Sequence, residues 1–144
     1  MKGYTSRIEI QNYLLITIDA SQQAQVDAWI TGMEAYVDRM TGRNFIADAV
    51  ASEKKYDGDN TGVLLIDDCV EVSEITIDDG DPLDTDDYYL YPANELPKRK
   101  IKYPGGTFPR GYQNISVTAK WGYSVTVPED RIKQNCMLCN EEIR

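Results

Sequence analysis

The first third of the chain carries apolar residues at the spacing of an amphipathic helix. The pattern i, i+3, i+4, i+7 places these residues along one face: Val26, Trp29, Ile30, Met33, Tyr36, Val37 and Met40. Gly42 follows where a left-handed C-terminal cap would end such a helix, and Asp19 or Ser21 can cap its start. The pattern predicts a helix over about 21–41.

Capping signals predict a helix before this one and another at the end of the chain. Ser6 and Glu9 stand three residues apart, so each side chain can accept a free backbone N–H of a first turn, and we predict a helix over about 6–15. Pro128, followed by Glu129 and Asp130, is typical of a helix start and predicts a helix over about 128–144. The apolar stripe of this last helix is Ile132, Cys136, Cys139 and Ile143.

From about residue 50 to 125 the hydrophobic period changes to two, and Gly and Pro interrupt the pattern. We expect short antiparallel strands near 53–57, 62–66, 70–77, 87–91, 99–103 and 113–121. Val72 and Ile75 do not share one parity, so a bulge is predicted near Ser73 and Glu74. The predicted fold class is α+β in a single domain, 1–144: two N-terminal helices and a C-terminal helix pack together, with a central antiparallel β region over about 50–125.

Acidic and basic residues are segregated along the chain, which has a net charge of -9. Between Tyr56 and Pro97 there is no Lys or Arg, but there are thirteen acids. The densest acidic run is Asp78, Asp79, Asp81, Asp84, Asp86 and Asp87, and the bases that follow are Lys98, Arg99, Lys100, Lys102 and Arg110. This pattern is typical of a solvated acidic face beside a basic turn, and it also suits head-to-tail contact between copies of one chain.

The sequence offers few tools for catalysis. It contains no histidine, which excludes Ser–His and Cys–His nucleophile pairs and most catalytic zinc sites. Phosphate-binding and dinucleotide-binding glycine motifs are also absent, so we expect no enzymatic activity and no cofactor. Without a signal-peptide pattern or an apolar run of about 18 residues, we expect synthesis in a cytoplasm and no membrane insertion.

Two motifs suggest metal or redox chemistry, and each has a simpler interpretation. Asp57, Asp59 and Asp68 occupy positions 1, 3 and 12 of a calcium-loop pattern, but the flanks predict strands, so a hairpin loop is the alternative. Cys136 and Cys139 form a CxxC without further zinc ligands, so they are interpreted as small apolar residues of a helix. Adjacent acids such as Asp86 and Asp87 leave open a carbohydrate-active site, for which solvated turn residues are the alternative.

Several segments, taken in chain order, resemble the head-to-tail connector (neck adaptor) proteins of tailed bacteriophages and their prophage relatives. They span most of the chain: Trp29-Ile30, Tyr36-Val37-Asp38-Arg39-Met40-Thr41-Gly42-Arg43-Asn44-Phe45, Tyr56-Asp57-Gly58, Leu64-Leu65-Ile66-Asp67, Tyr89-Leu90-Tyr91-Pro92, Val117-Thr118-Ala119-Lys120-Trp121-Gly122-Tyr123 and Val127-Pro128-Glu129-Asp130.

This resemblance implies a structural virion protein, made in the cytoplasm of the bacterial host and located in the neck of the particle. Such proteins form a ring, commonly of about twelve copies, that binds the portal protein, extends the DNA channel and receives a stopper or tail-completion protein. DNA would pass without specific binding, and the C-terminal segment from Ile132 to Arg144 would contact the portal. We expect Lys98, Arg99, Lys100 and Lys102 to meet acids of the neighbouring copy, while the acidic run lines the lumen or a surface of the ring. The alternatives are another neck protein, such as a stopper or tail-completion factor, or a calcium-binding or carbohydrate-active β domain.

Overall fold

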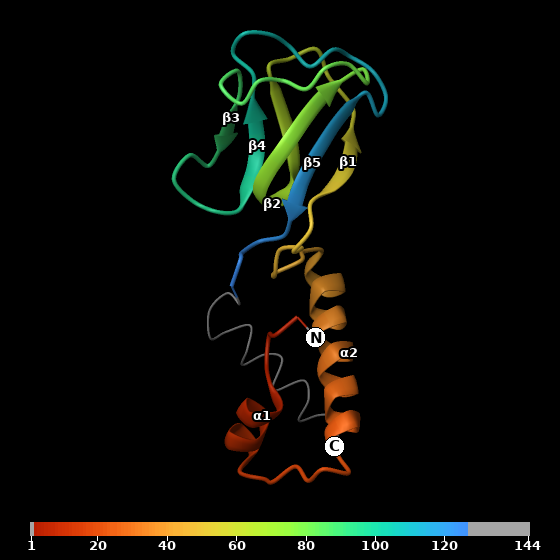
Figure 1. Ribbon diagram of the computed structural model, residues 1–144, viewed down its shortest axis with the longest axis vertical. Helices are drawn as coiled ribbons and strands as arrows, with labels where there is room; N and C mark the ends of the chain where they lie inside the picture. Colours follow the sequence, from red (N-terminus) through yellow and green to blue (C-terminus); the bar gives the residue numbers. More distant parts are fainter. Residues whose placement is uncertain (1, 127–144) are drawn as a thin grey trace. The chain divides into compact units, whose positions relative to one another are not determined.

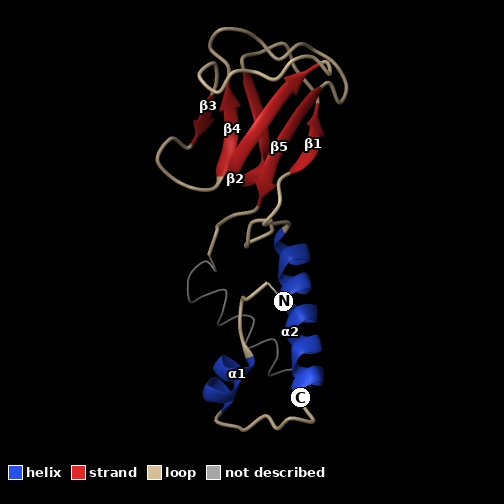
Figure 2. Ribbon diagram, in the orientation of Figure 1, coloured by secondary structure: helices blue, strands red, loops and turns tan. Residues whose placement is uncertain are grey.

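The computed structural model describes residues 2–126, drawn in colour in Figure 1. These residues contain two helices and one five-stranded antiparallel sheet (Figure 2). Contacts between residues divide the chain into two compact units. We call the part containing both helices the helical unit and Ile46–Val125 the sheet unit.

The two predicted N-terminal helices are present, and local capping explains where they begin and end. Helix α1 spans Arg7–Leu14, and the Ser6 hydroxyl accepts a hydrogen bond from the backbone N–H of Glu9 at 3.3 Å. Helix α2 spans Gln23–Thr41 and ends at Gly42, whose φ of 65° is the left-handed cap predicted from the sequence. The predicted N-caps of α2 are wrong, because the cap position is Gln22 and its side chain makes no cap hydrogen bond.

Among the described residues, the core of the helical unit is small. It consists of Ile10, Ile18, Val26 and Ile30, with Leu14 and Trp29 packed against it. Tyr36 and Met40, expected on the apolar stripe, are exposed instead. The buried position in the second half of α2 is Glu34, which is 1% exposed.

The sheet has the strand order β1-β5-β2-β4-β3. Its strands are β1 (Ser52–Tyr56), β2 (Val63–Ile77), β3 (Tyr89–Tyr91), β4 (Lys98–Lys102) and β5 (Ile115–Trp121). The long strand β2 replaces two predicted strands, because its first half pairs with β4 and its second half with β5. Cys69 belongs to both pairings, opposite Lys98 on one side and Trp121 on the other.

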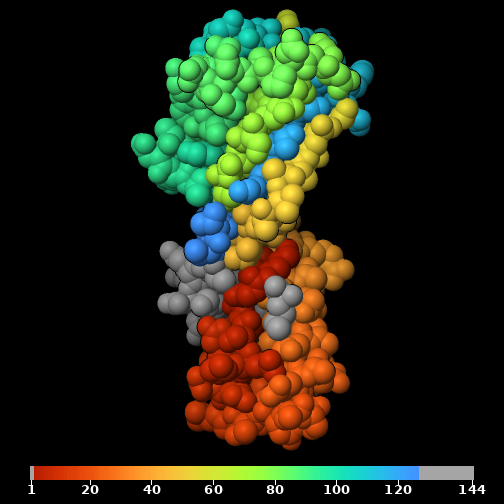
Figure 3. Space-filling view, viewed as in Figure 1, coloured from red at the N-terminus to blue at the C-terminus, as the bar shows by residue number. Residues whose placement is uncertain are grey.

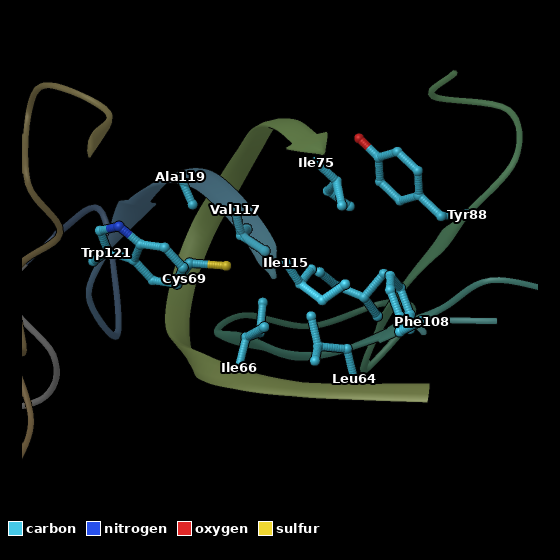
Figure 4. Close-up of a cluster of buried hydrophobic side chains, with 11 residues drawn as sticks. Leu64, Ile66, Cys69, Ile75, Tyr88, Phe108, Ile115, Val117, Ala119 and Trp121 are labelled. Carbon is cyan, nitrogen blue, oxygen red and sulfur yellow. The ribbon is translucent and has the colours of Figure 1, made fainter. Parts of the chain in front are cut away.

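Register irregularities in β2 fold the sheet on itself. One lies between Val72 and Glu74, which confirms the bulge predicted there, and further shifts flank Cys69 on both sides, which the sequence analysis did not predict. Figure 4 shows Leu64 and Ile66, from the first half of β2, pointing across the bend toward Val117 of β5. The sheet thereby encloses its own core: Leu64, Ile66, Cys69, Ile75, Tyr88, Ile101, Phe108, Ile115, Val117, Ala119 and Trp121.

Hydrogen bonds tie together the loops that follow β1, β2 and β4. The Asn60 N–H donates to the Phe108 carbonyl and the Phe108 N–H donates to the Thr61 carbonyl, each at 2.8 Å. The Asp78 N–H donates to the Asn114 carbonyl at the same distance. Gly58 is required by close approach, since a Cβ there would lie 1.9 Å from the Pro109 carbonyl oxygen. These three loops therefore form one connected end of the sheet unit.

The predicted fold class requires a correction, because three-helix packing is absent from residues 2–126. These residues hold two helices, and the predicted third helix, 128–144, lies outside them. The physical reason is that the folded sheet encloses one hydrophobic core and the helices enclose another. The antiparallel β region is confirmed, while the single domain over 1–144 remains a prediction. Among the described helices, none has the length and apolar character needed to cross a membrane.

Candidate assembly surfaces

Strand β4 brings lysines to one face of the sheet. Side chains alternate along a strand, so Lys100 and Lys102 lie on the side opposite the buried Ile101. In cross-strand register, Lys102 lies between Val63 and Tyr89, and Lys100 lies between Leu65 and Tyr91. We call these six residues the lysine face: Val63, Leu65, Tyr89, Tyr91, Lys100 and Lys102.

The predicted basic contact residues differ in what they bind within the chain. The Lys98 Nζ donates to the carbonyl oxygens of Pro92, at 2.5 Å, and Ala93, at 3.1 Å, and so holds the β3–β4 loop. The Lys102 Nζ lies 4.7 Å from the ring centroid of Tyr91, a cation–π distance. The Lys100 side chain has no hydrogen-bond or ion-pair partner within residues 2–126. Among these three lysines, Lys100 is therefore the one most available to a partner.

Arg99 lies on the other side of β4. Alternation separates its side chain from Lys98 and Lys100, and its Nε is 3.2 Å from Asp68 Oδ1. Because the Asp68 side chain is only 16% exposed, this pair links β4 to β2 inside the chain. The structure therefore separates Arg99 from the lysines with which the sequence groups it.

The predicted acidic run forms one exposed loop between β2 and β3, which we call the acidic loop (78–87). All six aspartates are exposed, and Asp79 alone has a cation within 4 Å in the described structure, the Lys55 Nζ at 3.9 Å. The loop is nevertheless anchored, since the Leu83 N–H donates to the Ile75 carbonyl at 2.9 Å and Tyr88 is buried in the core. The loop belongs to the sheet unit, in the green part of Figure 3. It presents closely spaced carboxylates from a fixed base.

The residues of the calcium-loop pattern do not assemble a site. Asp57 Oδ1 accepts the Gln113 N–H at 2.6 Å, and Asp59 Oδ1 accepts both the backbone N–H and the hydroxyl of Thr61. The Thr61 hydroxyl is the main reason that the pKa of Asp59 is lowered. Asp68 faces Arg99, and no group of three or more potential metal ligands occurs within the described part of the chain. Asp57 and Asp59 thus serve the hairpin loop.

Four predicted contact residues, Ile132, Cys136, Cys139 and Ile143, lie outside the described residues. The described cysteine, Cys69, is a buried free thiol at the turning point of β2. Burial, aided by the charge of Asp68, raises the pKa of this thiol to about 11. At neutral pH Cys69 is therefore a protonated, apolar core residue.

A buried carboxylate that the sequence analysis missed holds the N-terminal segment against α2. Glu34 Oε2 accepts the Lys2 N–H at 2.6 Å, and Oε1 accepts the N–H groups of Gly3 and Tyr4 at 2.9 and 3.0 Å. We call this arrangement the Glu34 clasp. A sequence signal did exist, because Glu34 continues the buried positions Val26 and Ile30 at a spacing of four.

An apolar groove in the helical unit was also missed. Its volume is about 410 Å³, and its apolar lining residues are Ile10, Leu14, Ile16, Ile18, Val26 and Trp29. Leu15 beside it is 91% exposed. The apolar residues beyond the end of α1, Leu15, Ile16 and Ile18, were the available signal.

No family model matches this sequence, and no curated protein matches it. The described residues offer charged and apolar surfaces suited to protein contact, in which the acids and the lysines occupy separate places on one unit.

Proposed function

We propose that this chain is a non-enzymatic structural subunit of the neck of a tailed bacteriophage, forming the ring adaptor between the portal and the tail or stopper. The observation that carries the proposal is the separation of opposite charges on the sheet unit. Five aspartates of the acidic loop and Lys100 of the lysine face have no ion-pair partner within residues 2–126. Both surfaces are therefore free to meet other molecules.

Two different complementary surfaces on one subunit suit a ring. A head-to-tail contact leaves one surface of each type unused until the last copy closes the ring. Complementary charge favours that orientation and disfavours contact between like surfaces. A head-to-tail contact of this kind would support the proposed self-association, which commonly involves about twelve copies in the family that the sequence resembles.

An acidic subunit also suits a channel through which DNA must move. Proteins bind DNA largely by neutralising phosphates with Lys and Arg, so carboxylates at the lumen lower that affinity. The net charge of -9 and the exposed acidic loop fit a channel wall that lets DNA pass without specific binding. In this proposal, the portal, a stopper or tail-completion protein and neighbouring copies are the partners, and no cofactor is needed.

The segments that resemble neck adaptors have structural roles in this chain. Gly42 caps α2, and the Trp121 side chain is buried while its Nε1 donates to the Ser52 carbonyl at 2.8 Å. Such residues would preserve a fold without marking a catalytic site, which fits a structural protein. By contrast, the intramolecular bonds of Asp57, Asp59 and Asp68 provide no observation in favour of the calcium-binding alternative.

The test is native mass spectrometry of the full chain, alone and mixed with portal rings from the same phage. We expect about one copy bound per portal subunit, and portal rings from an unrelated phage serve as the control. Failure to decorate the matching portal would refute the adaptor position. Binding to an isolated tail or to a preformed portal–adaptor complex would then identify a stopper or tail-completion protein.

A further inference from the structure

We infer that the lysine face is the docking surface for the acidic loop of a second copy of this chain, so that successive copies join head to tail. The inference rests on the proposed function and names the contact that would build its ring. It assigns the face to Lys100 and Lys102 with their strand neighbours, and it leaves Arg99 outside the contact.

The lysine face combines charge with exposed apolar area. Leu65 is 70% exposed, Tyr89 is 56% exposed and Val63 is 37% exposed, although all three belong to paired strands of the sheet. These residues flank Lys100 and Lys102 in adjacent rows. Apolar and aromatic neighbours would exclude water from a carboxylate bound at the lysines, which strengthens the charge interaction.

The acidic loop has the complementary features. Asp81, Asp84 and Asp86 are exposed and have no cation partner within the described residues. The base of the loop is fixed by the hydrogen bond from Leu83 to Ile75 and by the burial of Tyr88, so little entropy is lost when it binds. A loop that is anchored at its base and charged at its surface is a suitable ligand for a basic face.

The loop of the same chain does not occupy its own lysine face. Within residues 2–126, Lys100 has no acidic partner, and the one described ion pair of the loop joins Asp79 to Lys55 on β1. Strand β1 lies at the opposite edge of the sheet from β3, which carries Tyr89 and Tyr91. A second copy is therefore needed to bring the two surfaces together.

Nucleic acid is the competing partner, because phosphates also pair with lysines. The net charge of -9 and the six exposed aspartates of the acidic loop repel a polyanion and favour the second copy. The two partners predict different outcomes, since a loop variant should impair self-association but should not impair DNA binding.

Sedimentation equilibrium of the full chain tests the inference with a charge exchange. The face variant carries Lys100→Glu and Lys102→Glu, and the loop variant carries Asp84→Lys and Asp86→Lys. Each variant alone should associate at least about tenfold more weakly than the wild type, because like charges then meet. An equimolar mixture should recover association, since the altered face fits the altered loop and the two unaltered surfaces still fit each other.

Matched controls reverse one charge away from the proposed contact. Arg110→Glu and Glu95→Lys change exposed residues outside the lysine face and the acidic loop, and both should associate like the wild type. Circular dichroism of every variant checks that the fold is retained.

Three results would overturn the inference: a wild-type chain that stays monomeric, a face variant that associates normally, or a mixture that fails to recover. Duplex DNA binding that the face variant abolishes, without any self-association, would instead assign the face to nucleic acid. Portal decoration is measured separately, so a neck protein with a different ring contact would still decorate the portal.

Discussion

Removing the carboxylate of the Glu34 clasp should destabilise the helical unit strongly. In Glu34→Ala, the backbone N–H groups of Lys2, Gly3 and Tyr4 lose their shared acceptor. Hydrogen bonds to a charged group contribute about 1.5–3 kcal/mol each, and buried donors without a partner carry a further cost. Because bonds to one group are not additive, we expect a total loss of about 3–5 kcal/mol in the free energy of unfolding.

Glu34→Gln provides a graded test of the same reasoning. A glutamine carbonyl oxygen can replace Oε1 and keep the N–H groups of Gly3 and Tyr4, whereas its NH₂ group would face the Lys2 N–H. One hydrogen bond is therefore lost, and the other two are made to a neutral acceptor. We expect the free energy of unfolding to fall by about 1–3 kcal/mol. The order of stability should be wild type, then Glu34→Gln, then Glu34→Ala.

Urea unfolding followed by the helical circular dichroism signal measures these differences. Hydrogen exchange followed by mass spectrometry adds a local measurement, because the amides of Gly3 and Tyr4 should exchange faster in Glu34→Ala. Glu95→Ala removes an exposed carboxylate and should change stability by less than about 0.5 kcal/mol. If Glu34→Ala keeps both wild-type stability and slow exchange in the N-terminal segment, the proposed role of the clasp is refuted.

Three further predictions concern Gly58 and Cys69 of the sheet unit and Gly32 in the interior of α2. Gly58→Ala should lower stability by more than about 2 kcal/mol in thermal unfolding, because its Cβ would lie 1.9 Å from the Pro109 carbonyl oxygen. Gly32→Ala, with nothing within 4 Å of its Cβ, should instead raise stability by about 0.5–1 kcal/mol, and equal effects at both glycines would contradict this account. With Cys136 and Cys139 replaced by Ser, the Cys69 thiol should react slowly with a disulfide reagent at neutral pH, because burial raises its pKa to about 11. Rapid reaction of the Cys69 thiol in the folded protein at neutral pH would contradict its burial. The folded pKa of Cys69 also lies above the reference value of 9.0. The contribution of this thiol to stability is therefore complete below pH 9.0 and should be lost as the pH rises towards 11.

Local signals predicted the secondary structure well because their causes lie within a few residues. The end of α2 at Gly42 follows from the freedom of glycine to adopt positive φ, and the bulge near Ser73 follows from a change in side-chain parity. The N-cap of α2 was predicted wrongly, since Ser and Asp are favoured at such positions but the chain enters the helix through Gln22. The Asp19 side chain instead accepts the Ser21 N–H in the turn before the helix, so its capping capacity is used one step too early in the chain.

The candidate surfaces depended on pairing between distant residues, which no local pattern contains. Strand alternation alone separates Arg99 from Lys100, but only the register places Leu65 beside Lys100 and Asp68 within reach of Arg99. The Glu34 clasp likewise joins residues about thirty positions apart. Its acceptor could be suspected from helix spacing, whereas its donors could not.

The sequence by itself determined the two N-terminal helices, an antiparallel β region, the segregation of charge and the lack of histidine chemistry. Each of these follows from composition or from periodicities of 3.6 and 2, which operate over short distances. The tertiary structure decided that the sheet folds around Cys69 and encloses its own core, so that the described residues contain two small cores instead of a three-helix core. It also decided which charged residues are bound within the chain and which are exposed to a partner, because ion pairs depend on distances between side chains that only the folded chain sets.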